Sequence, residues 1–167
     1  MSKRRYARER AMQALYAYAL AGGDPEHASK TVIRTRLADD EPTLTFALEL
    51  FQKCVDHQGE ATEIIETHAQ NWSLERIAVI DRILLQMAIV EFLYVDDVPP
   101  KVTMNELIEI AKKYSTSGSG RFVNGILDAV LESLTAQGRI VKRGRGLVGM
   151  DDSRTDSEPD SKPSAAS

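Results

Sequence analysis

Apolar side chains recur with the period of an α-helix along most of this chain. Between residues 3 and 21 they fall at positions i, i+4, i+7, i+8 and i+11, which form one stripe of an amphipathic helix. The stripe is Ala7, Ala11, Ala14, Leu15 and Tyr18. Gly22 and Gly23 follow directly and end the pattern. The sequence therefore predicts a helix at its N-terminus.

The same period predicts six further helices. Asp24 and Pro25 are an N-cap and a first-turn proline, so a second helix runs from there to about residue 37. The third helix covers about residues 43–57, and the fourth begins after Gly59 and ends near Trp72. The fifth covers about 74–94, with Ser73 as its cap. The sixth covers about 103–114, and the last begins at Arg121 and ends at Gly138. Thr103 and Glu106 have the spacing of a capping box. Because no strand-like alternation and no internal repeat are found, the expected fold class is all-α.

The two most apolar stripes indicate where the core lies. The segment 74–94 leaves few polar positions, so it is expected to be buried on most sides. Leu84 lies at the centre of this stripe, and Leu127 lies at the centre of the stripe in the last helix. We expect both leucines to be core residues.

Beyond residue 140 the composition changes. Gly, Arg, Ser, Asp and Pro dominate, and the apolar period is lost. Such a segment buries too little apolar surface to offset the entropy cost of ordering the chain. We therefore expect one folded domain over residues 1–140 and a disordered tail over residues 141–167. A run of Arg and Gly from Arg143 to Gly146 is of a kind that adds sequence-independent RNA affinity, although a solubilising extension explains it equally well.

The composition fits one globular domain. The 167 residues are 43% hydrophobic, and one cysteine, Cys54, excludes a disulfide scaffold and a zinc site built from cysteines. No apolar run approaches the ~20 residues of a membrane span, and the N-terminus lacks the apolar run of a signal peptide. The expected location is the cytoplasm, with no membrane partner.

The net charge of −4 hides an uneven distribution. Residues 1–10 carry five basic side chains against one acidic, whereas residues 11–138 have a net charge of −9. Residues 139–149 add four basic side chains without an acid, and residues 150–167 return a net charge of −3. Since local clusters make a phosphate-binding surface, the acidic total does not exclude nucleic acid.

No catalytic constellation is found in the sequence. His27, His57 and His68 fall on different expected helices at no ligand spacing, so a zinc site is disfavoured and no cofactor is expected. The run Gly118 to Gly120 lacks the Lys-Ser/Thr of a Walker loop. Glu60, Glu63 and Glu66 share one helix face that we interpret as solvated. These observations favour binding over catalysis.

Two patches have residues suited to RNA. On the first helix Arg5 and Tyr16 lie within about 20° of each other, with Arg8 about 60° to one side, and they offer forked donors for phosphate and a ring for base stacking. A core role for Tyr16 is equally compatible with the pattern. The second patch is Arg121 and Phe122 at a helix start, where free amides attract phosphate. Packing of Phe122 in the core is the alternative there.

Four motifs, in the same order along residues 3–136, resemble the NusB family of transcription antitermination factors. They are Arg4-Arg5-Tyr6-Ala7-Arg8-Glu9 running into Gln13-Ala14-Leu15-Tyr16, Asp81-Arg82-Ile83-Leu84, Val98-Pro99-Pro100-Lys101-Val102 with Asn105-Glu106, and Phe122-Val123-Asn124-Gly125-Ile126-Leu127-Asp128. The resemblance implies two packed three-helix subdomains with an additional N-terminal helix. It also implies binding of single-stranded boxA RNA from ribosomal RNA operons, together with the small-subunit ribosomal protein that acts as NusE, in complexes that keep RNA polymerase elongating.

The resemblance also implies site residues. The RNA surface carried over by position is Arg4, Arg5, Arg8, Gln13, Tyr16, Gly118, Ser119, Gly120, Arg121 and Phe122, and the NusE surface lies near Asp81 and Arg82. Two other functions stay open: an accessory domain of a ribosomal RNA methyltransferase, and a scaffold that binds proteins only. The oligomeric state, monomer or homodimer, is also open.

Overall fold

The computed structural model describes residues 2–69 and 76–149, and these residues contain helices and connections but no strand. The helices are α1 (Lys3–Ala21), α2 (Pro25–Ala28), the π-helix η1 (Ser29–Arg34), α3 (Thr35–Leu37), α4 (Glu41–Asp56), α5 (Gln58–His68), α6 (Val79–Tyr94), α7 (Pro100–Tyr114), α8 (Ser119–Ala136) and the 3₁₀-helix η3 (Gly144–Leu147). Because α2, η1 and α3 follow one another without a break, they form the single second helix expected. The all-α fold class is confirmed.

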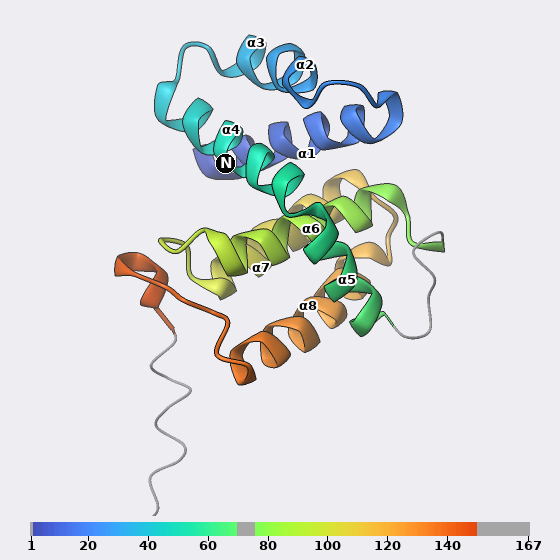
Figure 1. The fold of residues 1–167 in the computed structure, drawn as a ribbon, viewed down its shortest axis with the longest axis vertical. Helices are drawn as coiled ribbons and strands as arrows, with labels where there is room; N and C mark the ends of the chain where they lie inside the picture. The colour runs from blue at the N-terminus through green and yellow to red at the C-terminus, as the bar shows by residue number, and fades with distance from the viewer. Residues whose placement is uncertain (1, 70–75, 150–167) are drawn as a thin grey trace, which may run out of the picture.

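The helices form two groups with α6 between them. In Figure 1, α1 to α4 lie in the upper part and α5 to α8 lie below. Helix α6 packs against α1, α4, α5, α7 and α8, which explains why its sequence is apolar on nearly every side. Within the described residues, no helix has both the length and the apolar character needed to cross a membrane.

Side-chain caps set the start of three helices. The Asp24 carboxylate accepts a hydrogen bond from the Glu26 amide, which confirms this residue as the expected N-cap. Asp40 caps α4 through the Thr43 amide, so this helix begins at Glu41, with Pro42 in its first turn and not as a breaker. Ser2 caps α1 in the same way.

Several other expected boundaries are wrong. The helix expected over residues 74–94 is α6, which begins only at Val79. Helix α7 begins at Pro100 and not at Thr103, because proline suits the first turn, where a missing N–H costs nothing. Thr103 is buried inside the helix, so no capping box forms. Gly59 lies within α5, and α8 begins at Ser119, two residues earlier than expected. Ser73 lies outside the described residues, and so does the end near Trp72.

The expectation of a disordered chain from residue 141 is wrong for residues 141–149. The Lys142 ammonium is buried at the end of α6, where it donates to the carbonyl oxygens of Glu91 at 2.9 Å and Val95 at 2.6 Å. Val95 is the residue that follows α6, and the Glu91 carbonyl accepts from the Val95 amide as well. A lysine suits this place because carbonyl oxygens at the end of a helix attract a cation. Burial lowers the pKa of this ammonium to about 8. Residues 150–167 of the expected tail lie outside the described residues.

We expect Leu84→Ala and Leu127→Ala each to lower the free energy of unfolding by ~2–5 kcal/mol, because both leucines are fully buried and truncation leaves a cavity. Urea unfolding measures the loss. Leu20→Ala is the matched control, since this leucine is exposed, and it should change the stability by less than ~0.5 kcal/mol. Losses as small as the control at both core positions would contradict the packing described here.

Candidate nucleic-acid interface

The basic residues at the start of α1 are paired with acids from distant parts of the chain. Lys3 lies 3.2 Å from Asp40, and Arg4 lies 3.1 Å from Asp97. Arg5 pairs with Glu106 of α7 and Arg8 pairs with Glu91 of α6. We call the basic residues 3–10 the N-terminal head and residues 11–138, with their net negative charge, the acidic body. The positive charge of the head is thus partly neutralised by acids of the body. What each cation can still offer to a ligand depends on its burial.

Arg8 is buried and cannot reach a ligand at the surface. Its Nε and NH2 groups donate to both oxygens of Glu91, at 2.9 and 2.7 Å, and the two side chains are 2% and 0% exposed. The Thr103 hydroxyl donates to the same carboxylate. A guanidinium held this way inside the core has no free donor edge for phosphate. The structure therefore corrects the expectation that Arg8 belongs to the RNA surface.

Arg4 and Arg5 remain at the surface. The Arg5 guanidinium donates to both oxygens of Glu106, at 2.6 and 3.0 Å, and this hydrogen bonding lowers the pKa of the Glu106 carboxyl. The Arg4 guanidinium lies over the Phe46 ring, 4.5 Å from its centroid, and its side chain is half exposed. Both guanidiniums are held in place while part of each faces solvent.

Tyr16 lies further along α1 and is on the surface. Its side chain is 39% exposed, so the core alternative does not hold. Glu9, seven residues earlier and hence on the same helix face, is buried and accepts hydrogen bonds from Lys113 and Tyr114 at the end of α7. Tyr16 is therefore about 10 Å further along the helix face that meets the end of α7.

Gln13 lies between the head and Tyr16. It is half-buried, and its amide oxygen accepts a hydrogen bond from Arg10. The Arg10 guanidinium in turn lies over the Tyr6 ring, 4.7 Å from its centroid.

The loop before α8 is only partly available to a ligand. Gly118 and Arg121 are exposed, whereas Ser119 and Gly120 are buried. A Cβ atom on Gly120 would lie 3.2 Å from the Lys112 side chain, so any larger residue here would require that side chain to shift slightly. Phe122 is half-buried and packs against the core, which agrees with the packing alternative. Of the residues in this patch that were expected to bind RNA, only Gly118 and Arg121 are exposed to solvent.

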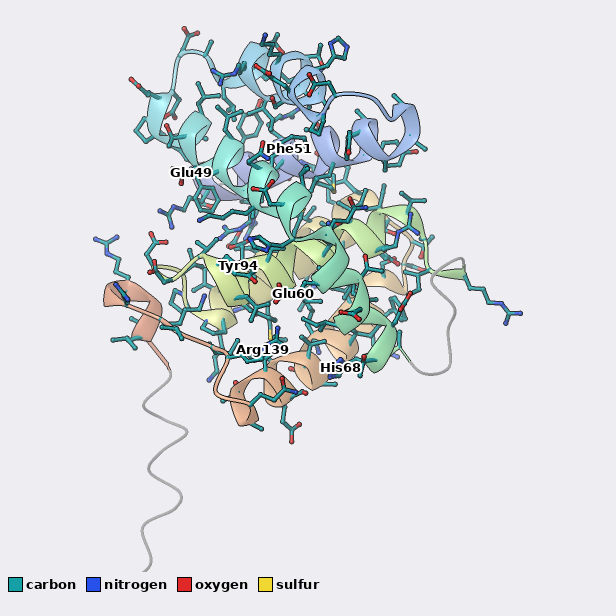
Figure 2. The ribbon with its side chains drawn as sticks, viewed as in Figure 1. Glu49, Phe51, Glu60, His68, Tyr94 and Arg139 are labelled. Carbon is teal, nitrogen blue, oxygen red and sulfur yellow. The ribbon has the colours of Figure 1, made fainter. Side chains whose placement is uncertain are left out.

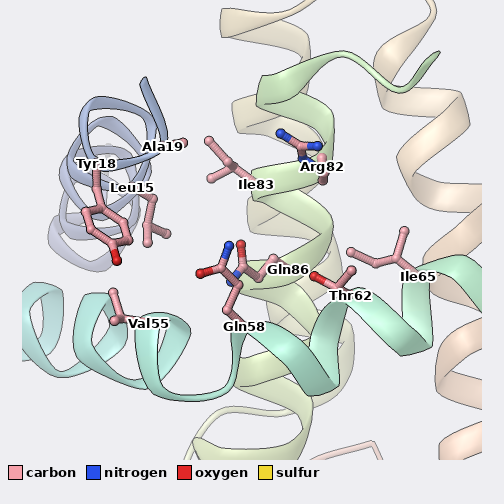
Figure 3. A pocket seen from close by; sticks show the side chains of 10 residues that line it. All are labelled: Leu15, Tyr18, Ala19, Val55, Gln58, Thr62, Ile65, Arg82, Ile83 and Gln86. Atoms are coloured by element: carbon pink, nitrogen blue, oxygen red, sulfur yellow. The ribbon is translucent and has the colours of Figure 1, made fainter. Parts of the chain in front are cut away.

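Asp81 and Arg82 differ in their surroundings. Asp81 is buried and accepts a hydrogen bond from the Ser119 hydroxyl at 2.9 Å, so it ties the start of α8 to α6 and does not face a partner. Arg82 lines a pocket of about 320 Å³ between α1, α5 and α6, together with Tyr18, Gln58 and Gln86 (Figure 3). Of the two residues expected to bind the partner, Asp81 is buried, whereas Arg82 is half-buried and its role stays a prediction.

The histidines and the α5 carboxylates lie elsewhere. Among the described residues no group of His, Cys, Asp and Glu could hold a metal ion. The His57 ring stacks on Tyr94, with 3.8 Å between ring centroids. Glu60 accepts hydrogen bonds from the Tyr94 hydroxyl at 2.6 Å and from Arg139 at 2.8 Å (Figure 2), so its interpretation as a solvated carboxylate is wrong. Glu63 and Glu66 are exposed as expected.

The acids that hold the head were not identified as site residues in the sequence. Glu91 and Glu106 follow their arginine partners by 83 and 101 residues. Residues so far apart in the sequence give no local pattern that would indicate their pairing. The one available hint was that Glu91 follows an apolar run in α6, where a buried carboxylate needs a cationic or hydrogen-bonding partner.

The model of the NusB family matches residues 5–132, which include most of α1 and most of α8. The chain belongs to the NusB family. It is 53% identical over 151 residues to the transcription antitermination protein NusB of Salinibacter ruber, covering 90% of this chain and 94% of that protein. It is 44% identical over 147 residues to the NusB protein of Chloroherpeton thalassium, covering 88% and 70% of the two chains.

A solved structure agrees with this assignment. The fold matches a chain in the crystal structure of antitermination factors NusB and NusE in complex with dsRNA, with a TM-score of 0.72 and 28% identity over 80% of this chain and 98% of that one. The family resemblance expected from the motifs is confirmed. This NusB family member is a transcription antitermination factor and not an enzyme.

Proposed function

We propose that this NusB family protein binds single-stranded boxA RNA of ribosomal RNA operons together with the ribosomal protein NusE, within the RNA polymerase antitermination complex in the cytoplasm. The observation that carries the proposal is the position of Arg4 and Arg5. Their guanidiniums are fixed at the surface of α1, on the same helix as the exposed ring of Tyr16. The fold match to a NusB chain in complex with NusE and RNA supports the same function.

Arg4 and Arg5 supply the phosphate contacts. The Arg4–Asp97 pair is about half exposed, and such a pair contributes only ~0.2–1 kcal/mol. Arg5 binds Glu106 through two hydrogen bonds and keeps only part of its side chain in contact with solvent. An RNA phosphate offers the same bidentate geometry with more negative charge, so it competes for the free edges of both guanidiniums. Arg8 supports this surface from inside and makes no contact with RNA.

Tyr16 and the α8 end extend the contact along α1. The exposed Tyr16 ring is a platform for one unpaired base, with the Gln13 amide beside it. Gly118 leaves room for the RNA chain, and Arg121 adds a charge where the N-terminal end of α8 is itself partially positive. Ser119, Gly120 and Phe122 shape this end by packing.

Arg82 is the proposed contact to NusE. It lies at the mouth of a pocket with polar groups from three helices, which suits recognition of an acidic or polar side chain of a partner. Asp81 acts indirectly, because its bond to Ser119 positions the start of α8.

Replacing Arg4 and Arg5 together by Ala should flatten the salt dependence of RNA affinity by ~1.4 log units per decade of salt, at ~0.7 for each lost phosphate contact. Affinity should fall for a boxA strand and a scrambled strand alike. Fluorescence anisotropy over a salt series measures both quantities. The control is Lys30→Ala with Arg34→Ala, two exposed cations on η1 whose loss changes the net charge equally.

Tyr16→Ala in the same titration should weaken binding by ~1–3 kcal/mol and leave the salt slope unchanged, because stacking releases no counterions. If the double arginine variant binds both strands as the parent does at every salt concentration, Arg4 and Arg5 are not the RNA contacts proposed here. A parent that binds neither strand would leave the protein-only scaffold.

Arg82→Glu should weaken the complex with NusE at least tenfold, because the variant puts a negative charge at the mouth of the pocket. The salt slope for RNA of the protein alone should stay unchanged. Calorimetry with purified NusE measures the first quantity, and Arg34→Glu is the control for the reversed charge. Unchanged NusE affinity in a folded Arg82→Glu variant would remove this residue from the interface.

A further inference from the structure

Residues 139–149 form a basic strap across one end of the domain, here called the C-terminal strap. They lie beyond the segment that the family model matches, which ends at residue 132. The strap leaves the end of α8 and runs past the end of α6 to η3, the orange-red segment in Figure 1. It holds four basic side chains and no acid. Its charge is therefore opposite to that of the acidic body.

Three buried contacts fix the path of the strap. Lys142 donates to the last carbonyls of α6, and the Arg143 amide donates to the Asp96 carbonyl at 2.9 Å. At Gly146 the backbone approaches the Asp96 carbonyl so closely that any Cβ atom would collide with it. At the near end Arg139 is bound to Glu60. The strap is thus anchored by backbone groups and by Lys142, and its other arginines are not needed as anchors.

The remaining arginines of the strap point to solvent. The Arg143 side chain is 80% exposed, and its nearest acid, Asp96, is at 4.0 Å and itself mostly exposed. Arg145 is exposed as well. Two guanidiniums are therefore presented on a backbone that is already ordered, which lowers the entropy cost of binding a ligand.

The strap lies next to the N-terminal head. The turn after α6 is Asp96-Asp97, and its two residues are each in contact with one chain end. Asp96 binds the strap through Arg143, whereas Asp97 pairs with Arg4. The exposed guanidiniums of Arg4 in the head and Arg143 in the strap therefore lie on either side of the Asp96-Asp97 turn. Arg143 thus continues the row of cations that begins with Arg5 and Arg4.

We propose that the C-terminal strap is a second phosphate-binding element, in which Arg143 and Arg145 hold the backbone of single-stranded RNA that continues past the head. The inference rests on the function proposed above and deepens it. Because guanidiniums on a solvent-exposed strap reach phosphates and not base edges, this contact is independent of sequence. It lengthens the RNA site at the Arg4 end of α1, opposite the Tyr16 end.

The test compares two RNA strands with the full-length chain. One strand is a short boxA oligonucleotide, and the other is the same oligonucleotide with unpaired nucleotides added on both sides. Arg143→Ala with Arg145→Ala should flatten the salt slope by ~1.4 log units per decade for the extended strand and leave the short strand unaffected. Lys142 is kept, so the strap stays anchored, and an unchanged melting temperature confirms this.

Lys30→Ala with Arg34→Ala is again the matched control, since it removes two exposed cations from a different part of the surface. Equal slopes for parent and strap variant on the extended strand would overturn the inference, and so would an equal loss in the control, which would indicate a general charge effect. The exposed Val141, Leu147 and Val148 offer a protein-binding alternative. Weakened binding to NusE or RNA polymerase with unchanged RNA affinity would select it and reject the RNA contact.

A failure of the strap proposal can be distinguished from a failure of the function proposed above. That function is tested by the parent and the Arg4, Arg5 variant on the short strand, to which the strap makes no contact. The strap can therefore fail while the head binds RNA.

Discussion

The buried ion pair of Arg8 and Glu91 is the contact around which the domain is organised. It joins α1 to α6, the Thr103 hydroxyl brings in α7, and the backbone carbonyl of Glu91 accepts from Lys142 of the C-terminal strap. Removal of one partner from such a pair leaves an uncompensated buried charge, at a typical cost of ~3–5 kcal/mol. Four segments that are far apart in the sequence therefore meet at Glu91: α1 and α7 bind its carboxylate from α6, and the C-terminal strap binds its backbone carbonyl.

This pair also determines what the surface can do. Because Arg8 is held in the core, Arg5 lies about one helical turn before it at the edge of the core, and Arg4 is turned further toward solvent. The basic run is thus divided between a structural anchor and a binding surface. The acids Asp97 and Glu106 orient the surface guanidiniums, so a ligand must compete with these pairs and does not need to order free side chains.

The sequence predicted the helices well because their information is local. The apolar period, Asp24 with Pro25, and the apolar segment around Leu84 all act within a few residues of one another. The failures have one physical cause, which is pairing across long separations. Arg8 was expected at the surface, since the periodicity of α1 cannot reveal an acid 83 residues away. Glu60 was expected to be solvated for the same reason, because Arg139 and Tyr94 lie far along the chain.

The site was predictable in part. Of the residues that the family motifs indicate for the RNA surface, Arg4, Tyr16 and Arg121 are exposed, and their role in binding stays a prediction. The sequence did not indicate that Asp81 is buried, or that residues 141–149 are ordered. In both cases the cause is tertiary contact that composition does not encode: Asp81 binds Ser119, and residues 142–146 bind the end of α6 and the turn after it.

A double-mutant cycle on the central pair tests the account most directly. Arg8→Met and Glu91→Met, measured alone and together by urea unfolding, should each cost ~3–5 kcal/mol, whereas the double variant should cost clearly less than the sum because no charge is left unpaired. The double variant should also keep the salt slope of the parent for RNA. A stable Arg8→Met variant whose salt slope falls by ~0.7 would make Arg8 a phosphate contact and contradict the account.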